Sequence, residues 1–156
     1  MAVLLQRQVF EISRAAEYFT ARELQAQTGQ SRQNFAQVVV KELVDNGLDA
    51  CETAGFPPEV SIEVSGQYTI TMVVTDNGPG LSPETIRRVL NFSTRTSDKA
   101  AYRSPSRGAQ GNALKTILGI PQALGGQEPV IIESQGVRHT IKARIDPAGN
   151  LGIDHQ

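Results

Sequence analysis

Residues 41–50 read KELVDNGLDA, and they lie inside a longer amphipathic pattern that begins near residue 31. The apolar residues of this pattern recur at helical spacing: Phe35, Val38, Val39, Leu43 and Ala50. The pattern predicts a helix from about Ser31 to Thr53. Gly47 interrupts it and is less favourable than Ala by roughly 1 kcal/mol. Something other than helix propensity is therefore expected to select this glycine.

The polar residues of this helix form their own line, because Glu42, Asn46 and Asp49 stand four and three positions apart. At about 100° per residue the three side chains share one face. A glutamate can act as general base toward a water, and an asparagine oxygen is a hard ligand that suits Mg²⁺. Without further motifs, the same triple is more typical of an ordinary solvated helix face.

Local signals predict one helical region before this segment and a short helix after it. Residues 10–28 have a helical pattern, in one or two pieces, with a Thr20–Glu23 capping box and a stop at Gly29. Ser82 caps a short helix that has Pro83 at its first position.

A further helix is expected to follow Gly111 and to be broken at Pro121. Residues 91–107 lack periodicity and are predicted to form a long polar loop.

Four β-rich runs complete the pattern. Residues 59–65 and 67–76 are expected to turn at Gly66, and residues 129–135 and 137–146 to turn at Gly136. The order of elements predicts an α+β two-layer sandwich, with a mixed, mostly antiparallel sheet and helices on one face.

The segment VVTDNGPG places Asp76 at the end of an apolar strand, ahead of Gly78 and Gly80. A buried carboxylate there suits the exocyclic amine of adenine, and the glycines let the backbone approach a flat ring. A plain Asn-Gly or Pro-Gly turn explains the glycines equally well. The position of Asp76 at the strand end favours the ligand interpretation.

The segment RGAQGNALK places Gly108 and Gly111 directly before a predicted helix. Backbone N–H groups at such a helix start can bind phosphates, and Lys115 adds positive charge one turn later. The Walker and dinucleotide spacings are both absent, so this motif is weak alone, and a simple helix cap explains it as well.

Composition narrows the classes of function. The chain has 156 residues, enough for one domain, and a net charge of -1, which argues against a strong nucleic-acid footprint. Cys51, the only cysteine, is expected to be a small buried residue near a helix end. No apolar run approaches the roughly eighteen residues of a membrane span, and a cytoplasmic location is expected by default.

Taken together and in this order, KELVDNGLDA, DNGPG and GAQGNALK resemble the motifs of the GHKL ATPases. This class includes gyrase-like topoisomerases, mismatch-repair MutL proteins, heat-shock chaperones and histidine kinases. Residues 13–52 are similar, more loosely, to the B subunit of type IIB topoisomerases (topoisomerase VI). The resemblance implies the Bergerat fold over residues 1–156 as a single domain. It also implies a helical N-terminal extension over about residues 1–30 and no transducer domain.

The resemblance also implies roles for individual residues. Glu42 would polarise the attacking water, Asn46 would hold Mg²⁺, and Asp76 would accept from the adenine amine. Asp49 would help to bind the cofactor by orienting its neighbours or the water network of the nucleotide. Gly78 and Gly80 would shape the base pocket. The phosphates of ATP would be wrapped by Gly108, Ala109, Gln110, Gly111, Asn112, Ala113, Leu114 and Lys115.

Within the loop 91–107, which corresponds to the ATP lid, the side chains able to reach phosphate are Thr94, Thr96, Ser97 and Lys99. Implied activity is Mg²⁺-dependent ATP hydrolysis that drives homodimerisation and lid closure, with a DNA-acting partner subunit. A nucleotide-gated assembly module that hydrolyses little ATP is the alternative.

Three departures from the family pattern stand out. Thr140, preceded by His139, is the only candidate for the late Gly-Thr pair, and Gly47 stands where a small hydroxyl residue is common. The γ-phosphate lysine of a following transducer domain cannot be assigned.

The rival functions are a protein kinase, which Glu42 disfavours, and a DNA-binding regulator. Residues 19–35 could form a helix-turn-helix, although its second helix would continue directly into the Glu42–Asn46 face. His139 and His155 lack partners at metal-ligand spacing, and both are expected at the surface.

Overall fold

The computed structural model describes residues 18–91, 103–104, 108–109, 113–148 and 150–156. Its helices are α1 (Ala21–Thr28), the 3-10 helix η2 (Arg32–Asn34), α2 (Phe35–Ala54), α3 (Pro83–Val89) and α4 (Ala113–Ala123). Its strands are β1 (Val60–Ser65), β2 (Thr71–Asp76), β3 (Arg103–Ser104), β4 (Gly108–Ala109), β5 (Val130–Ser134), β6 (Val137–Ile145) and β7 (Leu151–His155).

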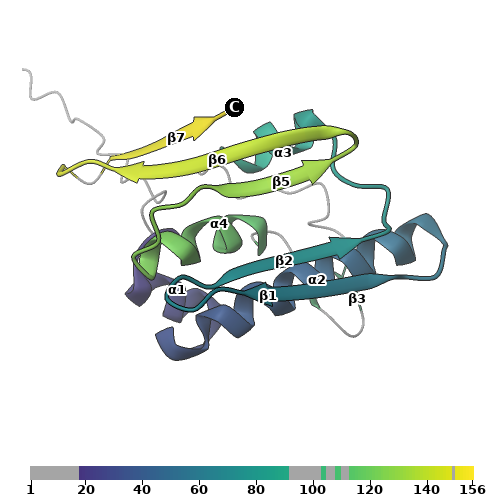
Figure 1. Ribbon diagram of the computed structural model, residues 1–156, viewed down its shortest axis with the longest axis horizontal. Coiled ribbons are helices and arrows are strands. Elements are labelled where there is room, and N and C mark those ends of the chain that lie inside the picture. Colours follow the sequence, from purple (N-terminus) through teal and green to yellow (C-terminus); the bar gives the residue numbers. More distant parts are fainter. Residues whose placement is uncertain (1–17, 92–102, 105–107, 110–112, 149) are drawn as a thin grey trace, which may run out of the picture.

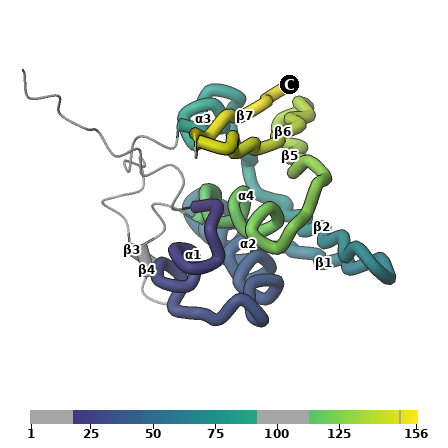
Figure 2. Tube along the Cα trace, turned by 90° about the vertical axis from the view of Figure 1, so that its left-hand side faces the viewer, coloured from purple at the N-terminus to yellow at the C-terminus, as the bar shows by residue number. Residues whose placement is uncertain are grey.

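The strands form antiparallel ladders: the hairpin β1–β2, the short pair β3–β4 and the three-stranded sheet β5–β6–β7. Figures 1 and 2 show β1, β2, β5 and β6 along one side of the molecule, with α1, α2 and α4 along the other. This arrangement confirms the predicted α+β layering. The expected mixed character of the sheet is not seen in the ranges described, where every ladder is antiparallel.

Two apolar clusters hold the layers together. One joins α1, α2 and α4 through Leu24, Phe35, Val38, Val39, Ile117 and Ile120. The other joins the sheet β5–β7 to α3 and α4 through Tyr18, Phe19, Ile86, Leu118 and Ile141. Because α4 contributes to both clusters, its residues from Lys115 to Ile120 are all buried. An all-round buried helix of this kind belongs at the centre of a domain.

The long predicted helix is confirmed, with a short 3-10 turn in front of it. Helical backbone begins at Arg32, becomes α-helical at Phe35 and ends at Ala54, where Gly55 takes the left-handed conformation with φ 79°. The helix runs without a break through Glu42 and Asn46. This continuity gives the helix-turn-helix interpretation no support.

The start and stop signals of α1 also hold. The hydroxyl of Thr20 accepts a hydrogen bond from the Glu23 backbone N–H at 3.3 Å, and Gly29 has φ 68°. The helix expected over residues 10–28 therefore begins at Ala21 in the part that is described. Residues 10–17 lie outside it.

The predicted break at Pro121 is wrong, because α4 continues to Ala123. Proline removes one helical N–H, but near a helix end this affects a single bond. The next turn is still closed, since the N–H of Leu124 donates to the carbonyl of Ile120 at 3.0 Å.

The strands differ from expectation in two places. The run 67–76 forms a strand only from Thr71, because residues 67–70 make the tip of the hairpin after Gly66. Strand β7 was not predicted from the sequence, and it pairs with β6 from Ile145↔Leu151 to Ile141↔His155. The other hairpin turn is at Gln135 and Gly136, both with positive φ, as the glycine predicted.

None of the helices that the structure describes has the length and apolar character that a bilayer crossing needs.

Candidate functional site

The predicted polar face of α2 is present, and burial increases along it. Glu42 and Asn46 are half-buried, whereas Asp49 is 3% exposed and has polar interactions of its own. The Nδ2 atom of Asn46 is buried and has no hydrogen-bond partner among the described residues. An unpaired buried amide is costly, and a bound ligand can supply what it lacks.

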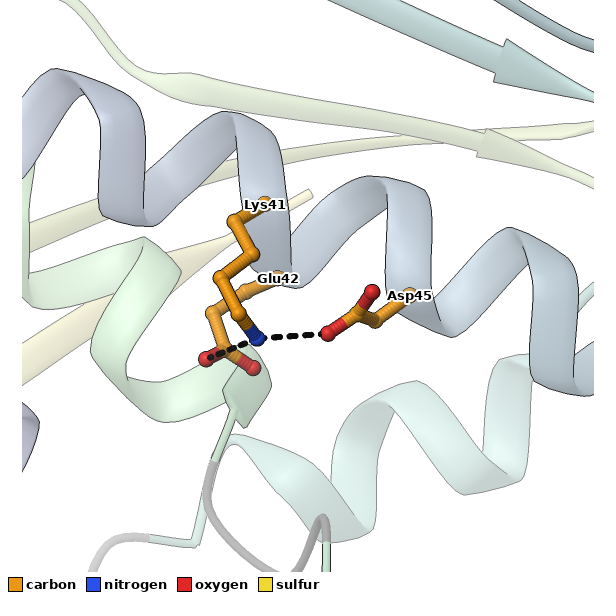
Figure 3. Close-up of polar contacts among 3 residues, drawn as sticks. All are labelled: Lys41, Glu42 and Asp45. Carbon is orange, nitrogen blue, oxygen red and sulfur yellow. Dashed lines mark hydrogen bonds and ion pairs between the residues drawn. The ribbon is translucent and has the colours of Figure 1, made fainter. Parts of the chain in front are cut away.

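Glu42 has two charged neighbours on α2, which sequence reasoning did not single out. The Nζ of Lys41 lies 2.6 Å from Oδ2 of Asp45 and 3.9 Å from Oε1 of Glu42 (Figure 3). Burial raises the pKa of Glu42 above its usual value, and Asp45 adds to this rise while Lys41 opposes it. A carboxylate with a raised pKa is a better proton acceptor once it is ionised.

Asp76, at the end of β2, lies against α2 at Gly47. A Cβ atom on Gly47 would stand 2.9 Å from the Cβ of Asp76. This contact is the reason for a glycine inside the helix, and it places the adenine-binding candidate against the residue that follows Asn46 on α2. Asp76 was expected to be buried, and this is wrong. The residue is exposed although its Cβ faces Gly47, because it stands at the very end of the strand.

The loop after β2 is fixed at both ends by side chains. Oδ1 of Asp76 accepts a hydrogen bond from the N–H of Gly78 at 2.8 Å. The side chain of Asn77 donates to the carbonyl of Pro57 and accepts from the N–H of Glu59. Asn77 thus ties the loop to the segment that follows α2, a role that its Asn-Gly context could have suggested.

Both glycines of this loop avoid close contacts with neighbouring side chains, and Gly80 also has φ 74°, a conformation that favours glycine. A Cβ on Gly78 would lie 2.7 Å from Oδ1 of Asp76, and one on Gly80 would lie 2.5 Å from Oγ of Ser134. Ser134 also accepts a hydrogen bond from the N–H of Leu81 at 2.7 Å. The turn interpretation therefore explains the glycines on its own, and their contact with a base stays a prediction.

The predicted phosphate segment is described only in part. Gly108 and Ala109 form β4, Ala113 and Leu114 open α4, and both of these helix residues are half-buried. Lys115 is 5% exposed, and its Nζ lies 5.8 Å from the ring centre of Tyr18. Gln110, Gly111 and Asn112 lie outside the described residues, as do the lid candidates Thr94, Thr96, Ser97 and Lys99.

The late-strand candidate Thr140 is half-buried on β6, where its backbone exchanges hydrogen bonds with Gln156. The surface location expected for His139 is wrong: this side chain is 4% exposed, and its Nδ1 lies 2.8 Å from Nε2 of the half-buried His155. The two histidines meet because β6 and β7 pair, and that pairing was not predicted. Cys51 is buried near the end of α2, as expected.

The described residues contain no group of three or more His, Cys, Asp or Glu side chains that could hold a metal ion. A Mg²⁺ ion held by one side chain and nucleotide phosphates needs no such group. Asn46 is the side chain at this site that offers an amide oxygen for a metal, and its unpaired buried Nδ2 is a donor that suits a phosphate oxygen.

A groove of about 450 Å³ lies beside α2, lined by Ala36, Gln37, Val40, Lys41, Val44, Asp45 and Met72. At about 100° per residue, Val40 and Val44 face away from Glu42 and Asn46. The groove therefore lies mainly on the other side of α2 and borders the polar face through Lys41, whose Nζ is 3.9 Å from Oε1 of Glu42.

The layered fold and the three ordered motifs define a GHKL-type ATPase domain. The chain belongs to the family of histidine kinase-, DNA gyrase B- and HSP90-like ATPases, whose model matches residues 31–147.

Among curated relatives, the B subunit of type 2 DNA topoisomerase 6 from Thermococcus kodakarensis is 34% identical over 149 residues, which is 92% of this chain and 26% of the relative. The corresponding B subunit from Methanosarcina barkeri is 39% identical over 99 residues, covering 62% of this chain and 16% of the relative. That from Halobacterium salinarum is 40% identical over 97 residues, covering 62% and 12%. The chain thus spans about a quarter or less of these relatives. No solved structure matches it.

Proposed function

We propose that this chain is the ATP-binding domain of a topoisomerase VI B-like protein and that it binds ATP with Mg²⁺ between α2 and the loop after β2. The observation that carries the proposal is the contact of Asp76 with Gly47. It joins the adenine-binding candidate to the helix that bears Glu42 and Asn46. In this proposal the three polar residues line one wall of the nucleotide site.

Each side chain has a distinct role in this proposal. Oδ2 of Asp76 accepts a hydrogen bond from the adenine amine, because Oδ1 is already used by Gly78. Asn46 contributes its amide oxygen to Mg²⁺, which would neutralise charge on the phosphates. Glu42 accepts a proton from the water that attacks the terminal phosphate. Asp49, the most buried of them, orients its neighbours.

The phosphate-binding role of residues 108–115 rests on the family resemblance and on the start of α4. Helix α4 begins at Ala113, so its first N–H groups point toward the end where the glycine-rich segment arrives. Lys115 is buried beside Tyr18, and we propose that it acts from within the helix start rather than from the surface.

ATP-dependent homodimerisation and lid closure are proposed from the family resemblance. A DNA-acting partner subunit is proposed because the relatives are named as B subunits of DNA topoisomerases. The second candidate is an assembly module that binds ATP but hydrolyses little of it. It shares the binding residues and differs in giving Glu42 no catalytic role.

Calorimetric titration of the chain with Mg²⁺ and ATP tests binding, and Asp76→Asn supplies the specific variant. Loss of a charge-assisted hydrogen bond should weaken ATP binding by about tenfold or more. Equal affinity of both proteins would remove Asp76 from the site.

Glu42→Ala should retain binding but lose at least about a hundredfold in turnover. Unchanged turnover in this variant would remove Glu42 as the base, whereas ATP binding with little turnover by the wild-type chain would favour the assembly module.

The dimerisation proposal is tested separately, by light scattering with and without a non-hydrolysable ATP analogue. We expect a monomer without nucleotide and a dimer with it. A monomer in both states would reject nucleotide-driven dimerisation by this domain.

A further inference from the structure

Three charged side chains of α2 form a linear arrangement at the catalytic candidate. The ammonium of Lys41 lies between two carboxylates, 2.6 Å from Asp45 and 3.9 Å from Glu42 (Figure 3). The side chain of Lys41 is 63% exposed, whereas those of Asp45 and Glu42 are 13% and 25% exposed. The lysine is therefore a surface residue that covers two less accessible carboxylates.

We propose that Lys41, tethered by Asp45, is a positioning residue that keeps the Glu42 carboxylate ionised while leaving its oxygens free for the attacking water. The consequence for turnover rests on the proposed function. The arrangement of charges exists without nucleotide, so it can be tested independently.

The two distances explain why both partners are needed. A separation of 3.9 Å is too long for a hydrogen bond, yet two charges at that distance still attract each other. The short hydrogen bond from Lys41 to Asp45, at the favourable spacing of four residues, holds the ammonium in that place. Without it, Lys41 could move onto Glu42 and occupy the lone pairs that a general base needs.

The pKa shifts of Glu42 and Lys41 agree with this geometry. Burial raises the pKa of Glu42, which disfavours the ionised form, and Lys41 acts in the opposite direction. The pKa of Lys41 is itself raised, chiefly by its hydrogen bond to Asp45, so the ammonium stays charged wherever Glu42 titrates.

Charges on the neighbouring elements do not replace Lys41. Among the residues described, the charged groups that shift the pKa of Glu42 are Lys41 and Asp45. The elements packed against α2 are α1, α4, β2, β1 and η2. Their charged side chains are Arg22 and Glu23 on α1, Lys115 on α4, Asp76 on β2, Glu63 on β1 and Arg32 on η2.

The direct test follows the carboxyl carbon of Glu42 by NMR during an acid titration of the whole chain without nucleotide. The signal is assigned by its loss in Glu42→Gln. Lys41→Met removes the charge at similar length, Lys41→Arg retains it, and Lys142→Met removes an exposed lysine of β6 as a matched control.

We expect the Glu42 midpoint to rise in Lys41→Met and to stay near the wild-type value in Lys41→Arg and Lys142→Met. The difference should shrink at high salt, because Lys41 is exposed and its field is screened. An unchanged midpoint in Lys41→Met, or an equal rise in Lys142→Met, would overturn the proposal.

The pH dependence of ATP turnover gives a second test, with a result that a purely structural lysine would not produce. On the acidic side of the pH–rate profile, Lys41→Met should lose about two- to fivefold, the range expected for one exposed charge pair, and it should match wild type at higher pH. A uniform loss at every pH would contradict the positioning role. If the wild-type chain binds ATP but shows no turnover, the proposed catalytic role of Glu42 fails, while the NMR titration still decides the role of Lys41.

Discussion

Gly47 of α2 and Asp76 at the end of β2 are in such close contact that a Cβ on the glycine would lie 2.9 Å from the Cβ of the aspartate. The first variant to follow from this contact is Gly47→Val. Replacing glycine in a helix gains up to roughly 1 kcal/mol of helix propensity, the value for alanine. The branched side chain of valine, however, would displace the backbone of Asp76. We expect a net loss of about 2 kcal/mol or more in the free energy of unfolding, measured with denaturant.

Gly47→Ala is the matched comparison, because a single methyl group needs a smaller displacement. It should weaken ATP binding less than Gly47→Val does. If Gly47→Val has the same free energy of unfolding and the same ATP affinity as the wild type, the contact between α2 and β2 does not position Asp76.

A second glycine, Gly119, is required by the core. A Cβ at this position in α4 would lie 1.5 Å from the carbonyl oxygen of Tyr18, which is backbone and cannot rotate away. Gly119→Ala should therefore destabilise the fold by about 3 kcal/mol, despite the better helix propensity of alanine. Thermal and denaturant unfolding measure the change. Gly152→Ala is the control, since the atom nearest to its added Cβ lies 3.9 Å away; comparable losses in both variants would contradict the packing argument.

Glu42, the general-base candidate, should lower the free energy of unfolding at neutral pH, where its half-buried carboxylate is ionised. Burial raises the folded-state pKa of Glu42 above the usual value of 4.5, so the native state binds this proton more tightly than the unfolded chain. Stability due to Glu42 is therefore lost as pH rises from 4.5 through the folded pKa.

Glu42→Gln removes this titration, and we expect a higher melting temperature than wild type at neutral pH. The advantage should disappear below the unfolded pKa. A variant that is less stable than wild type at neutral pH, or whose advantage grows on acidification, would contradict the raised pKa.

Local sequence signals predicted most elements because each depends on neighbours in the chain. The periodicity of α2 placed Glu42, Asn46 and Asp49 on one face, and Gly55 and Gly29 end their helices as glycines commonly do. The contact between Gly47 and Asp76 needed tertiary structure. Its only trace in the sequence was a glycine at an unfavourable place in a helix.

The errors have the same physical origin. β7 is a strand of five residues that depends on pairing with β6, so its own sequence carries little signal. His139 was assigned to the surface because its partner, His155, lies on that unpredicted strand. The polarity of Asp76 fits its exposed position, whereas the expectation of burial came from the apolar strand before it.

The pair formed by His139 and His155 supports the last prediction, a loss of stability in mild acid. The pKa of His155 is lowered by burial first, then by His139 and by Arg87 of α3. The unfolded chain therefore takes up a proton on this histidine more readily than the native state. Stability falls as pH decreases through 6.5 toward the folded pKa.

His155→Gln removes the titrating group, so its melting temperature should depend less on pH across this interval. Arg87→Gln, which removes one opposing charge, should give an intermediate slope. Identical slopes in wild type and His155→Gln would show that the histidine pair does not couple folding of β7 to protonation.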